Sequence, residues 1–380
     1  TYDENAVFLS GNGPLVDVLR EALARDDVRM NKESGNSIRK TDALNKAKLF
    51  IQNIHHFRSE YIEDQSAPVE KVVIFDEAQR AWTKEQTSSF MKQKKGLDNF
   101  EMSEPEFLIG VMDRHNDWAV IICLIGGGQE INRGEAGLPE WFDTLKNKYK
   151  NWNIWVSSDL KEFEYNRGKN LFKDIDQNRL QVKEKLHLSV SVRSFRSEKV
   201  SSFVKALLDC DYAANEILVQ LKEKYPIRIT RDIDKAKNWL RKKARGTERT
   251  GILASSGGRR LKPYGVYAKN NIDPRQWFLN NKNDVRSSFY LEDVATEFDI
   301  QGLELDWTCL CWDLDLRFDN QRWDYKEFKG TSWNNINDES KQLYLKNSYR
   351  VLLTRARQGM IVFVPEGDKS NPLEDQTRNP

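Results

Sequence analysis

The chain has 380 residues, is 39% hydrophobic, and carries 60 Lys plus Arg against 58 Asp plus Glu. This length is sufficient for two domains with buried cores, and the balanced charge excludes a global electrostatic signature of nucleic-acid binding. The longest apolar runs, such as residues 118–125, have the length of a strand and are too short to cross a bilayer, so the composition excludes a membrane protein.

The ends and the cysteines of the chain favour a cytoplasmic protein. The sequence begins at Thr1 without the basic and apolar leader of a secreted protein, and we expect it to be a fragment of a longer protein. The cysteines are few and scattered, which suits a reducing compartment. Cys309 and Cys311 point to the same face of a predicted strand, and because no second thiol pair or nearby His completes a zinc site, we expect both in the core.

The first part of the chain predicts an α/β domain over residues 1–150. Apolar residues at helical spacing predict helices at 13–26 and 41–58. Strands are expected at 5–11, 69–78 and 118–128. The last two are continuous apolar runs that end in polar or glycine residues, which is typical of strands buried on both faces of a parallel sheet.

The sequence becomes polar and irregular near residues 150–185, where we place a domain boundary. A second α/β series then covers residues 151–366, and the polar tail 367–380 is expected to be disordered. Its predicted strands lie near 185–195, 225–232, 250–256, 297–316 and 360–365, with helices at 197–209, 232–244 and 339–358. Strands that alternate with helices predict mostly parallel, doubly covered sheets in both domains.

The stretch VVIFDEAQRAW, residues 72–82, carries the clearest chemistry. An apolar strand that ends in Asp76 and Glu77 places two carboxylates at the edge where open α/β sheets bind ligands. Asp76 is suited to hold Mg²⁺ through water and Glu77 to orient and deprotonate an attacking water, as phosphoryl transfer requires. The alternative is a pair of strand-end carboxylates that only caps the following helix.

Further stretches place polar groups beside predicted strands. CLIGGGQEINRGEAG ends a strand in a glycine-rich loop with Gln129 at its tip, suited to sense a γ-phosphate, although a surface turn is the alternative. Arg193 and Arg196 follow another strand, where a guanidinium stabilises charge on a transferring phosphoryl group. Arg355 and Arg357 lie late in a predicted helix, where an arginine is often only a partner of the helix dipole.

The joint order of these segments resembles that of superfamily 1 helicases, over nearly the whole chain. The matching segments are VFLSGNG, VVIFDEAQ, LIGGGQEI, SVRS, EFDIQGLELD and VLLTRARQG. QGLE followed by LTRAR at this separation is the most specific part. DEAQRAW and EFDIQGLELDW also look much the same in a bacterial family of helicase-like proteins related to the helicase region of Schlafen proteins. The resemblance implies two RecA-like domains with ATP and Mg²⁺ as cofactors and single-stranded DNA or RNA as partner.

In the first domain, the resemblance implies roles for five residues. Asp76 and Glu77 correspond to the magnesium-binding and water-activating carboxylates, and Gln129 corresponds to the γ-phosphate sensor of the third motif. Ser10 and Asn12 match the segment that contacts the tracked strand.

In the second domain, Arg193 matches the arginine finger of the fourth motif, and Arg196 is the alternative because the local repeat RSFRS leaves the register open. Arg355 matches the phosphate-contacting arginine of the sixth motif. The fifth motif, which links nucleic acid to the nucleotide, has matching residues at Gln301, Gly302 and Glu304.

Two departures from the family pattern affect the expected mechanism. Gly127 occupies the position where the third motif usually carries an Asp, which weakens the expected coupling of nucleotide to strand. No G-x-x-x-x-G-K-[ST] loop occurs in the sequence, so the backbone cradle for phosphates and its lysine are missing. We therefore expect the first RecA-like domain to be incomplete at its N-terminus, with the Walker A loop supplied by an upstream domain or a second chain.

Three functions follow as hypotheses. The first is an ATP-dependent DNA or RNA helicase or translocase, inactive as this fragment without its phosphate-binding loop. The alternative is a degenerate helicase-like module that binds nucleic acid or a partner protein without turnover. A nuclease using Asp76 and Glu77 ranks last, because the further carboxylate and lysine of such a site have no local counterpart.

Overall fold

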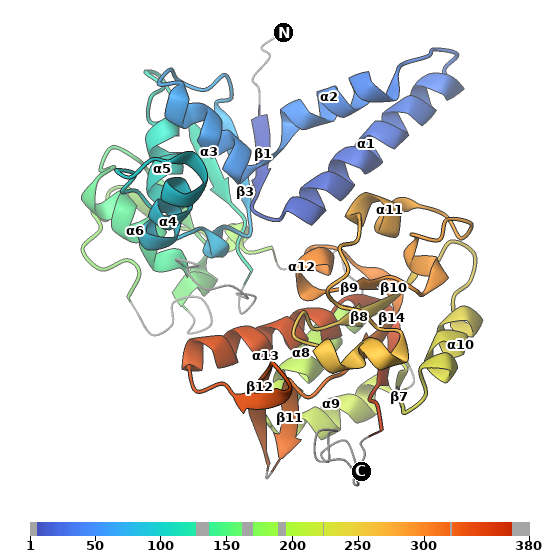
Figure 1. Cartoon of the computed structure of the whole chain (residues 1–380). Helices are drawn as coiled ribbons and strands as arrows, with labels where there is room; N and C mark the ends of the chain where they lie inside the picture. Colours follow the sequence, from blue (N-terminus) through green and yellow to red (C-terminus); the bar gives the residue numbers. More distant parts are fainter. Residues whose placement is uncertain are drawn as a thin grey trace. The chain divides into compact units, whose positions relative to one another are not determined.

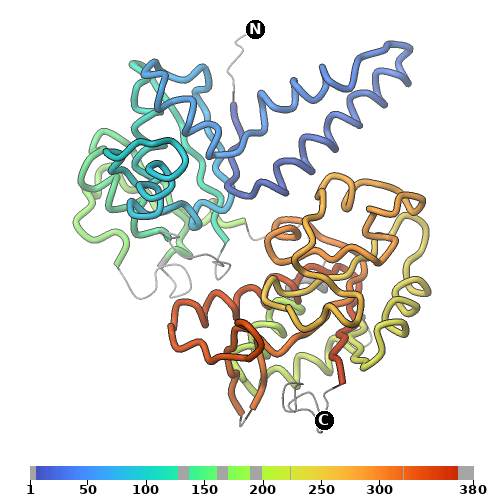
Figure 2. Tube along the Cα trace, viewed as in Figure 1, coloured from blue at the N-terminus to red at the C-terminus, as the bar shows by residue number. Residues whose placement is uncertain are grey.

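The computed structural model describes residues 6–126, 137–161, 170–188, 195–222, 224–319 and 321–366. The chain divides into two compact units, residues 1–190 and 191–380. Each unit is built on a parallel sheet with helices packed against it (Figures 1 and 2). The predicted α/β class, with two RecA-like domains and mostly parallel sheets, is confirmed. No helix within the described ranges has the length and apolar character needed to span a membrane.

The sheet of the first unit has four parallel strands in the order β2 (Ile51–Asn53), β1 (Ala6–Ser10), β3 (Val72–Asp76) and β4 (Val120–Cys123). Ser10 is in register with both Asn53 and Asp76. Since all strands run in the same direction, these three residues meet at the carboxyl edge of the sheet, where open α/β sheets bind ligands.

Helices of the first unit follow and precede the strands of this sheet along the chain. They are α1 (Gly13–Glu33), α2 (Lys40–Phe50), α3 (Ile54–Glu63), α4 (Lys84–Lys95), α5 (Glu104–Met112) and α6 (Gly137–Asn147). The core face of the sheet consists of Val7, Leu9, Val73 and Phe75. The predicted helix 41–58 is wrong, because residues 51–53 pair with β1 as β2 and divide it into α2 and α3.

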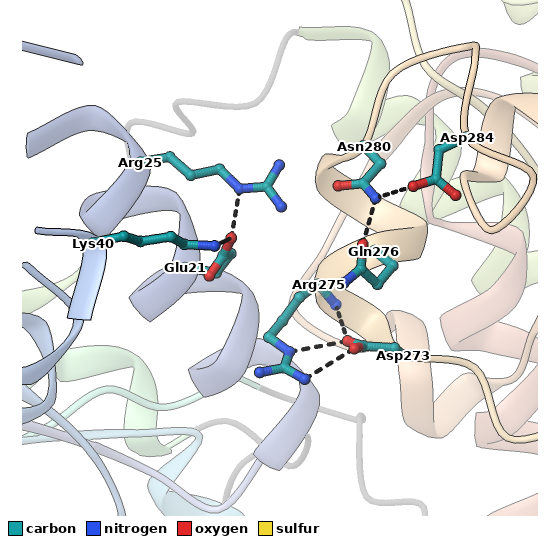
Figure 3. A network of polar contacts seen from close by, with 8 residues as sticks. All are labelled: Glu21, Arg25, Lys40, Asp273, Arg275, Gln276, Asn280 and Asp284. Carbon is teal, nitrogen blue, oxygen red and sulfur yellow. Dashed lines mark hydrogen bonds and ion pairs between the residues drawn. The ribbon is translucent and has the colours of Figure 1, made fainter. Parts of the chain in front are cut away.

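Helices α1 and α2 lie side by side as a helical hairpin (Figures 1 and 2). Glu21 of α1 is a buried glutamate, with 4% of its surface exposed. Its Oε1 accepts hydrogen bonds from Arg25 Nε and Lys40 Nζ, each at 2.6 Å, as the left half of Figure 3 shows. This ion pair network joins the two helices, because Lys40 is the first residue of α2.

Residues 151–188 belong to the first unit, so the chain divides after residue 190 and not after residue 150. This region contains the parallel pair β5 (Ile154–Val156) and β6 (Leu180–Val182), with short 3₁₀ turns η2 (Ser158–Lys161) and η3 (Glu184–Leu186). Its apolar side chains form one cluster with Leu138 and Phe142 of α6. The sequence did not predict this packing, because the buried residues are irregularly spaced in a polar segment.

The sheet of the second unit has five parallel strands in the order β7 (Ile227–Thr230), β14 (Ala356–Phe363), β10 (Leu305–Cys311), β8 (Thr250–Ala254) and β9 (Val294–Ala295). Its helices are α8 (Phe195–Leu208), α9 (Ala213–Leu221), α10 (Ile233–Lys243), α11 (Pro274–Leu279), α12 (Glu297–Ile300) and α13 (Glu339–Leu353), with 3₁₀ turns η4 (Arg259–Tyr264) and η5 (Ser288–Tyr290). Cys309 and Cys311 are fully buried on β10, as predicted.

Several details of the second unit depart from the predictions. Within the strand predicted at 297–316, residues 297–300 form helix α12, and β10 begins only at Leu305. Helix α13 ends at Leu353, five residues before the predicted end, because residues from Ala356 onward pair with β10. An unpredicted antiparallel sheet, β11 (Leu316–Asp319), β12 (Arg322–Lys329) and β13 (Ser332–Asn335), lies between β10 and α13 in the chain. It is held by cross-strand aromatic pairs, Phe318 with Trp323 and Phe328 with Trp333.

Polar side chains organise the turn around α11. Asp273 caps this helix by accepting a hydrogen bond from the backbone N of Arg275 at 3.0 Å, and its carboxylate also accepts from the Arg275 guanidinium (Figure 3). Asn280, just after the helix, donates to the Asp284 carboxylate at 2.6 Å. The cap at Asp273 defines the residue at which α11 begins.

Candidate nucleotide and nucleic-acid site

Asp76 ends β3 at the carboxyl edge of the first sheet, beside Ser10 of β1. Burial, and then the negative charge of Glu77, raise the pKa of the Asp76 carboxyl to about 6 from its usual value near 3.8. A carboxylate that is partly desolvated and next to a second carboxylate is stabilised by a bound cation. A cation bound beside Asp76 and Glu77 would therefore be favoured electrostatically.

Glu77 has a left-handed backbone conformation, with φ of 53°. A non-glycine residue in this region costs about 1–3 kcal/mol and persists only where its surroundings hold it. The side chain is held by Gln79, whose Nε2 donates to Glu77 Oε2 at 2.5 Å while its Oε1 accepts from the backbone N of Gly126 at 3.1 Å. Gln79 is 3% exposed and had no predicted role, although the sequence DEAQ already contains it.

The backbone after Glu77 is tied to neighbouring elements. The N of Ala78 donates to the carbonyl of Leu124 at 2.9 Å, and the Trp141 indole Nε1 donates to the carbonyl of Ala78 at 2.8 Å. Glu77 precedes the 3₁₀ turn η1 (Ala78–Arg80) without a capping hydrogen bond from its side chain. The alternative in which the carboxylates only cap the next helix is therefore wrong for Glu77.

Ser10 and Asn12 follow the neighbouring strand at the same edge. Ser10 is fully buried, and its Oγ accepts a hydrogen bond from the backbone N of Asn12 at 3.2 Å. Asn12 is partly exposed, and its Oδ1 caps α1 by accepting from the N of Leu15 at 3.3 Å. Of the two residues predicted to contact the nucleic-acid strand, Asn12 is partly exposed, whereas Ser10 is fully buried.

In the second unit, the fifth and sixth motifs meet at the start of β10 and β14. Glu304 accepts a hydrogen bond from Arg357 Nε at 3.0 Å, and the N of Leu305 donates to the carbonyl of Arg355 at 2.9 Å. Gly302 has φ of 75°, a conformation that glycine adopts without strain, and Gln301 is buried. The two motifs, far apart in sequence, therefore form one structural feature.

Arg355 is 2% exposed and follows Thr354, the residue that caps the C-terminus of α13. Its Nε donates to the carbonyl of Val351 at 3.0 Å, and its Nη2 donates to Thr354 Oγ1 at 3.1 Å. These bonds place a positive charge at the carboxyl end of a helix, where it is stabilised by the helix dipole. The predicted phosphate contact stays a prediction, and a structural role is added to it.

Several predicted residues lie outside the described part of the chain. Gln129 and Gly127 fall in 127–136, Arg193 falls in 189–194, and the tail 367–380 follows the last described residue. Arg196 belongs to helix α8, but its side chain is not among those described.

The oxygen donors of Asp76 and Glu77 fit Mg²⁺, which is commonly held by one or two carboxylates together with substrate phosphates and waters. Within the described ranges, no group of three His, Cys, Asp or Glu side chains is arranged to hold a metal ion. The nuclease hypothesis requires a further metal ligand beside these two carboxylates, and it stays a prediction.

A comparison with known families decides the relationship. The Schlafen group 3 DNA/RNA helicase domain matches residues 1–366. The chain belongs to this family. The match to the Schlafen helicase domain spans both compact units and confirms the predicted resemblance. A search of curated proteins gives no significant match.

Proposed function

We propose that this Schlafen helicase domain is the motor of an ATP-dependent DNA or RNA helicase or translocase, which couples hydrolysis to movement on a single strand. The observation that carries the proposal is the pair Asp76 and Glu77 at the carboxyl edge of a parallel sheet, with Asn12 at the same edge. Nucleotide chemistry and strand contact are then both served by neighbouring strand ends of one sheet.

Two carboxylates divide the chemistry of the first unit. Asp76 would hold Mg²⁺, which would neutralise charge on the nucleotide phosphates. Glu77 accepts a proton from the attacking water, and Gln79 keeps the Glu77 carboxylate in place. Gln129 senses the γ-phosphate. In the second unit, the residues that we propose for nucleotide contacts are Arg193 or Arg196, Gln301, Gly302, Glu304 and Arg355.

The phosphate-binding loop comes from an upstream domain or a second chain. This part of the proposal is supported by β4, which within the described residues pairs only with β3. Val120 and Ile122 on β4 are 40% and 43% exposed. Since parallel sheets normally have both faces covered, a further strand and helix that carry the loop would cover these side chains.

The test compares ATP hydrolysis by this chain with hydrolysis by a longer protein, in which a segment with the phosphate-binding loop is joined to this chain. We call this longer protein the loop-containing protein. We expect hydrolysis only by the loop-containing protein, and a higher rate when single-stranded DNA or RNA is present. If neither protein hydrolyses ATP while both bind strands, the motor is wrong and a binding module without turnover takes its place.

Hydrolysis should also depend on pH through Asp76. Its pKa is raised to about 6, so the side chain loses its charge, and with it its attraction for Mg²⁺, as pH falls through this value. We expect kcat of the loop-containing protein to fall below pH 6, with the acidic limb moving to lower pH as the Mg²⁺ concentration rises, because Mg²⁺ and protons compete for the carboxylate. An acidic limb of the kcat profile whose position does not change with the Mg²⁺ concentration would contradict this role of Asp76.

A further inference from the structure

The chain segment that leaves Glu77 is clamped at its far end by Glu104. The backbone N of Trp82 donates to Glu104 Oε2 at 3.1 Å, and the backbone N of Glu104 donates to the carbonyl of Trp82 at 3.0 Å. Glu104 is the first residue of α5 and is 2% exposed. Residues 77–82 are therefore held between β3 and the start of α5.

The other oxygen of Glu104 pairs with a buried arginine. Arg58 of α3 is fully buried, and its Nη1 donates to Glu104 Oε1 at 3.0 Å. Its guanidinium carbon lies 5.0 Å from the ring centroids of both Trp82 and Phe90. Within the described residues, Arg58 Nε has no hydrogen-bond partner. A buried ion pair is weak support for stability, so this pair requires another explanation.

Polar contacts connect the ion pair of Arg58 and Glu104 to the carboxyl edge of the sheet. Arg58 Nη2 lies 3.1 Å from His55 Nδ1, and the backbone N of His55 donates to Asn53 Oδ1 at 2.9 Å. Burial, and then the charge of Arg58, lower the pKa of His55 to about 4, so at neutral pH its Nδ1 is available as an acceptor. Asn53 ends β2 in register with Ser10.

We propose that Arg58 and Glu104 are positioning residues, which hold segment 77–82 so that Glu77 faces the attacking water. The inference rests on the proposed function. Its basis is geometric: Glu77 has a left-handed backbone that its surroundings must impose, and Glu104 holds both backbone polar groups of Trp82, five residues further on.

The direct test is Glu104→Gln in the loop-containing protein. The amide keeps the shape of the side chain, but its NH₂ group faces a donor in either orientation, because Arg58 and the Trp82 N both donate to the carboxylate. We expect kcat to fall about 10- to 100-fold, as small displacements of catalytic groups cause, while KM for ATP stays unchanged.

Glu21→Gln is the matched control. Glu21 is also a buried, ion-paired glutamate of the first unit, and its partners Arg25 and Lys40 belong to α1 and α2 (Figure 3). We expect a loss of thermal stability but an unchanged kcat at temperatures where the protein is folded. Equal losses of kcat in both variants, or an unchanged kcat in Glu104→Gln, would overturn the positioning role.

A second variant protects the test against unfolding. Arg58→Met with Glu104→Met removes both charges with side chains of similar volume, which often preserves stability, yet leaves no acceptor for the Trp82 N. We expect a folded protein with the same reduced kcat, and a parental kcat would overturn the proposal. Absence of hydrolysis in the parent protein would overturn the proposed function and the positioning role together.

Discussion

Replacement of Glu77 by Gln in the loop-containing protein is expected to reduce ATP hydrolysis about 10³-fold, the typical contribution of a general base. The amide oxygen can still accept the hydrogen bond that Gln79 Nε2 donates to Glu77, so the local structure should persist. The amide cannot take a proton from water at neutral pH. Single-turnover hydrolysis and equilibrium ATP binding, measured side by side, should therefore show a lost rate and a retained affinity.

Glu85→Gln provides the control for this experiment, because Glu85 is an exposed glutamate in the first turn of α4. Its variant should hydrolyse ATP at the parental rate. A Glu77→Gln protein that turns over as fast as the parent would remove Glu77 from the mechanism. Such a result would also separate Glu77 from Asp76, whose magnesium role is tested by pH.

Arg355→Ala is expected to lower the free energy of unfolding by about 3 kcal/mol. The substitution deletes a side chain that is 2% exposed, and it leaves the carbonyl of Val351 and the hydroxyl of Thr354 without their guanidinium donor. Denaturant unfolding of this chain, followed by a probe in the second unit, measures the change. Loss of hydrolysis in this variant should then be interpreted only after its stability is known.

Arg357→Ala is the comparison for Arg355, because Arg357 is two residues away and has a side chain that is 62% exposed. Its ion pair with Glu304 is at the surface, where such pairs contribute about 0–1 kcal/mol, so little stability should be lost. If Arg355→Ala were as stable as the parent, the bonds to α13 would be dispensable. The phosphate contact would then be the role that stays proposed for Arg355.

Much of the fold follows from local patterns. The apolar runs before Asp76 and around Ile122 became β3 and β4, and the helical spacing after Gly13 became α1. Asp76 and Glu77 could be placed at a sheet edge, because charged residues that end a buried strand lie where that strand leaves the sheet. The order of the motifs along the chain also predicted the family.

Other features depend on contacts between distant residues. A three-residue strand such as β2 has no periodicity of its own, and only its pairing with β1 interrupts the predicted helix. The polar region after residue 150 joins the first unit through a few irregularly spaced apolar side chains, so its composition suggested a boundary instead. Arg58 and Glu104 carry no motif that singles them out, and the DEAQ motif contains Gln79 without indicating its hydrogen bond to Glu77.

By itself, the sequence determined the class of fold, the family and the identity of the strand-end carboxylates, because hydrophobic periodicity and motif order are properties of neighbouring residues. Only the tertiary structure decided what holds those carboxylates. The bonds from Gln79 to Gly126 and from Glu104 to Trp82 and Arg58 span 22 to 47 residues. Such contacts form only when the sheet and its helices bring distant segments together, and their energies are not encoded in any local pattern.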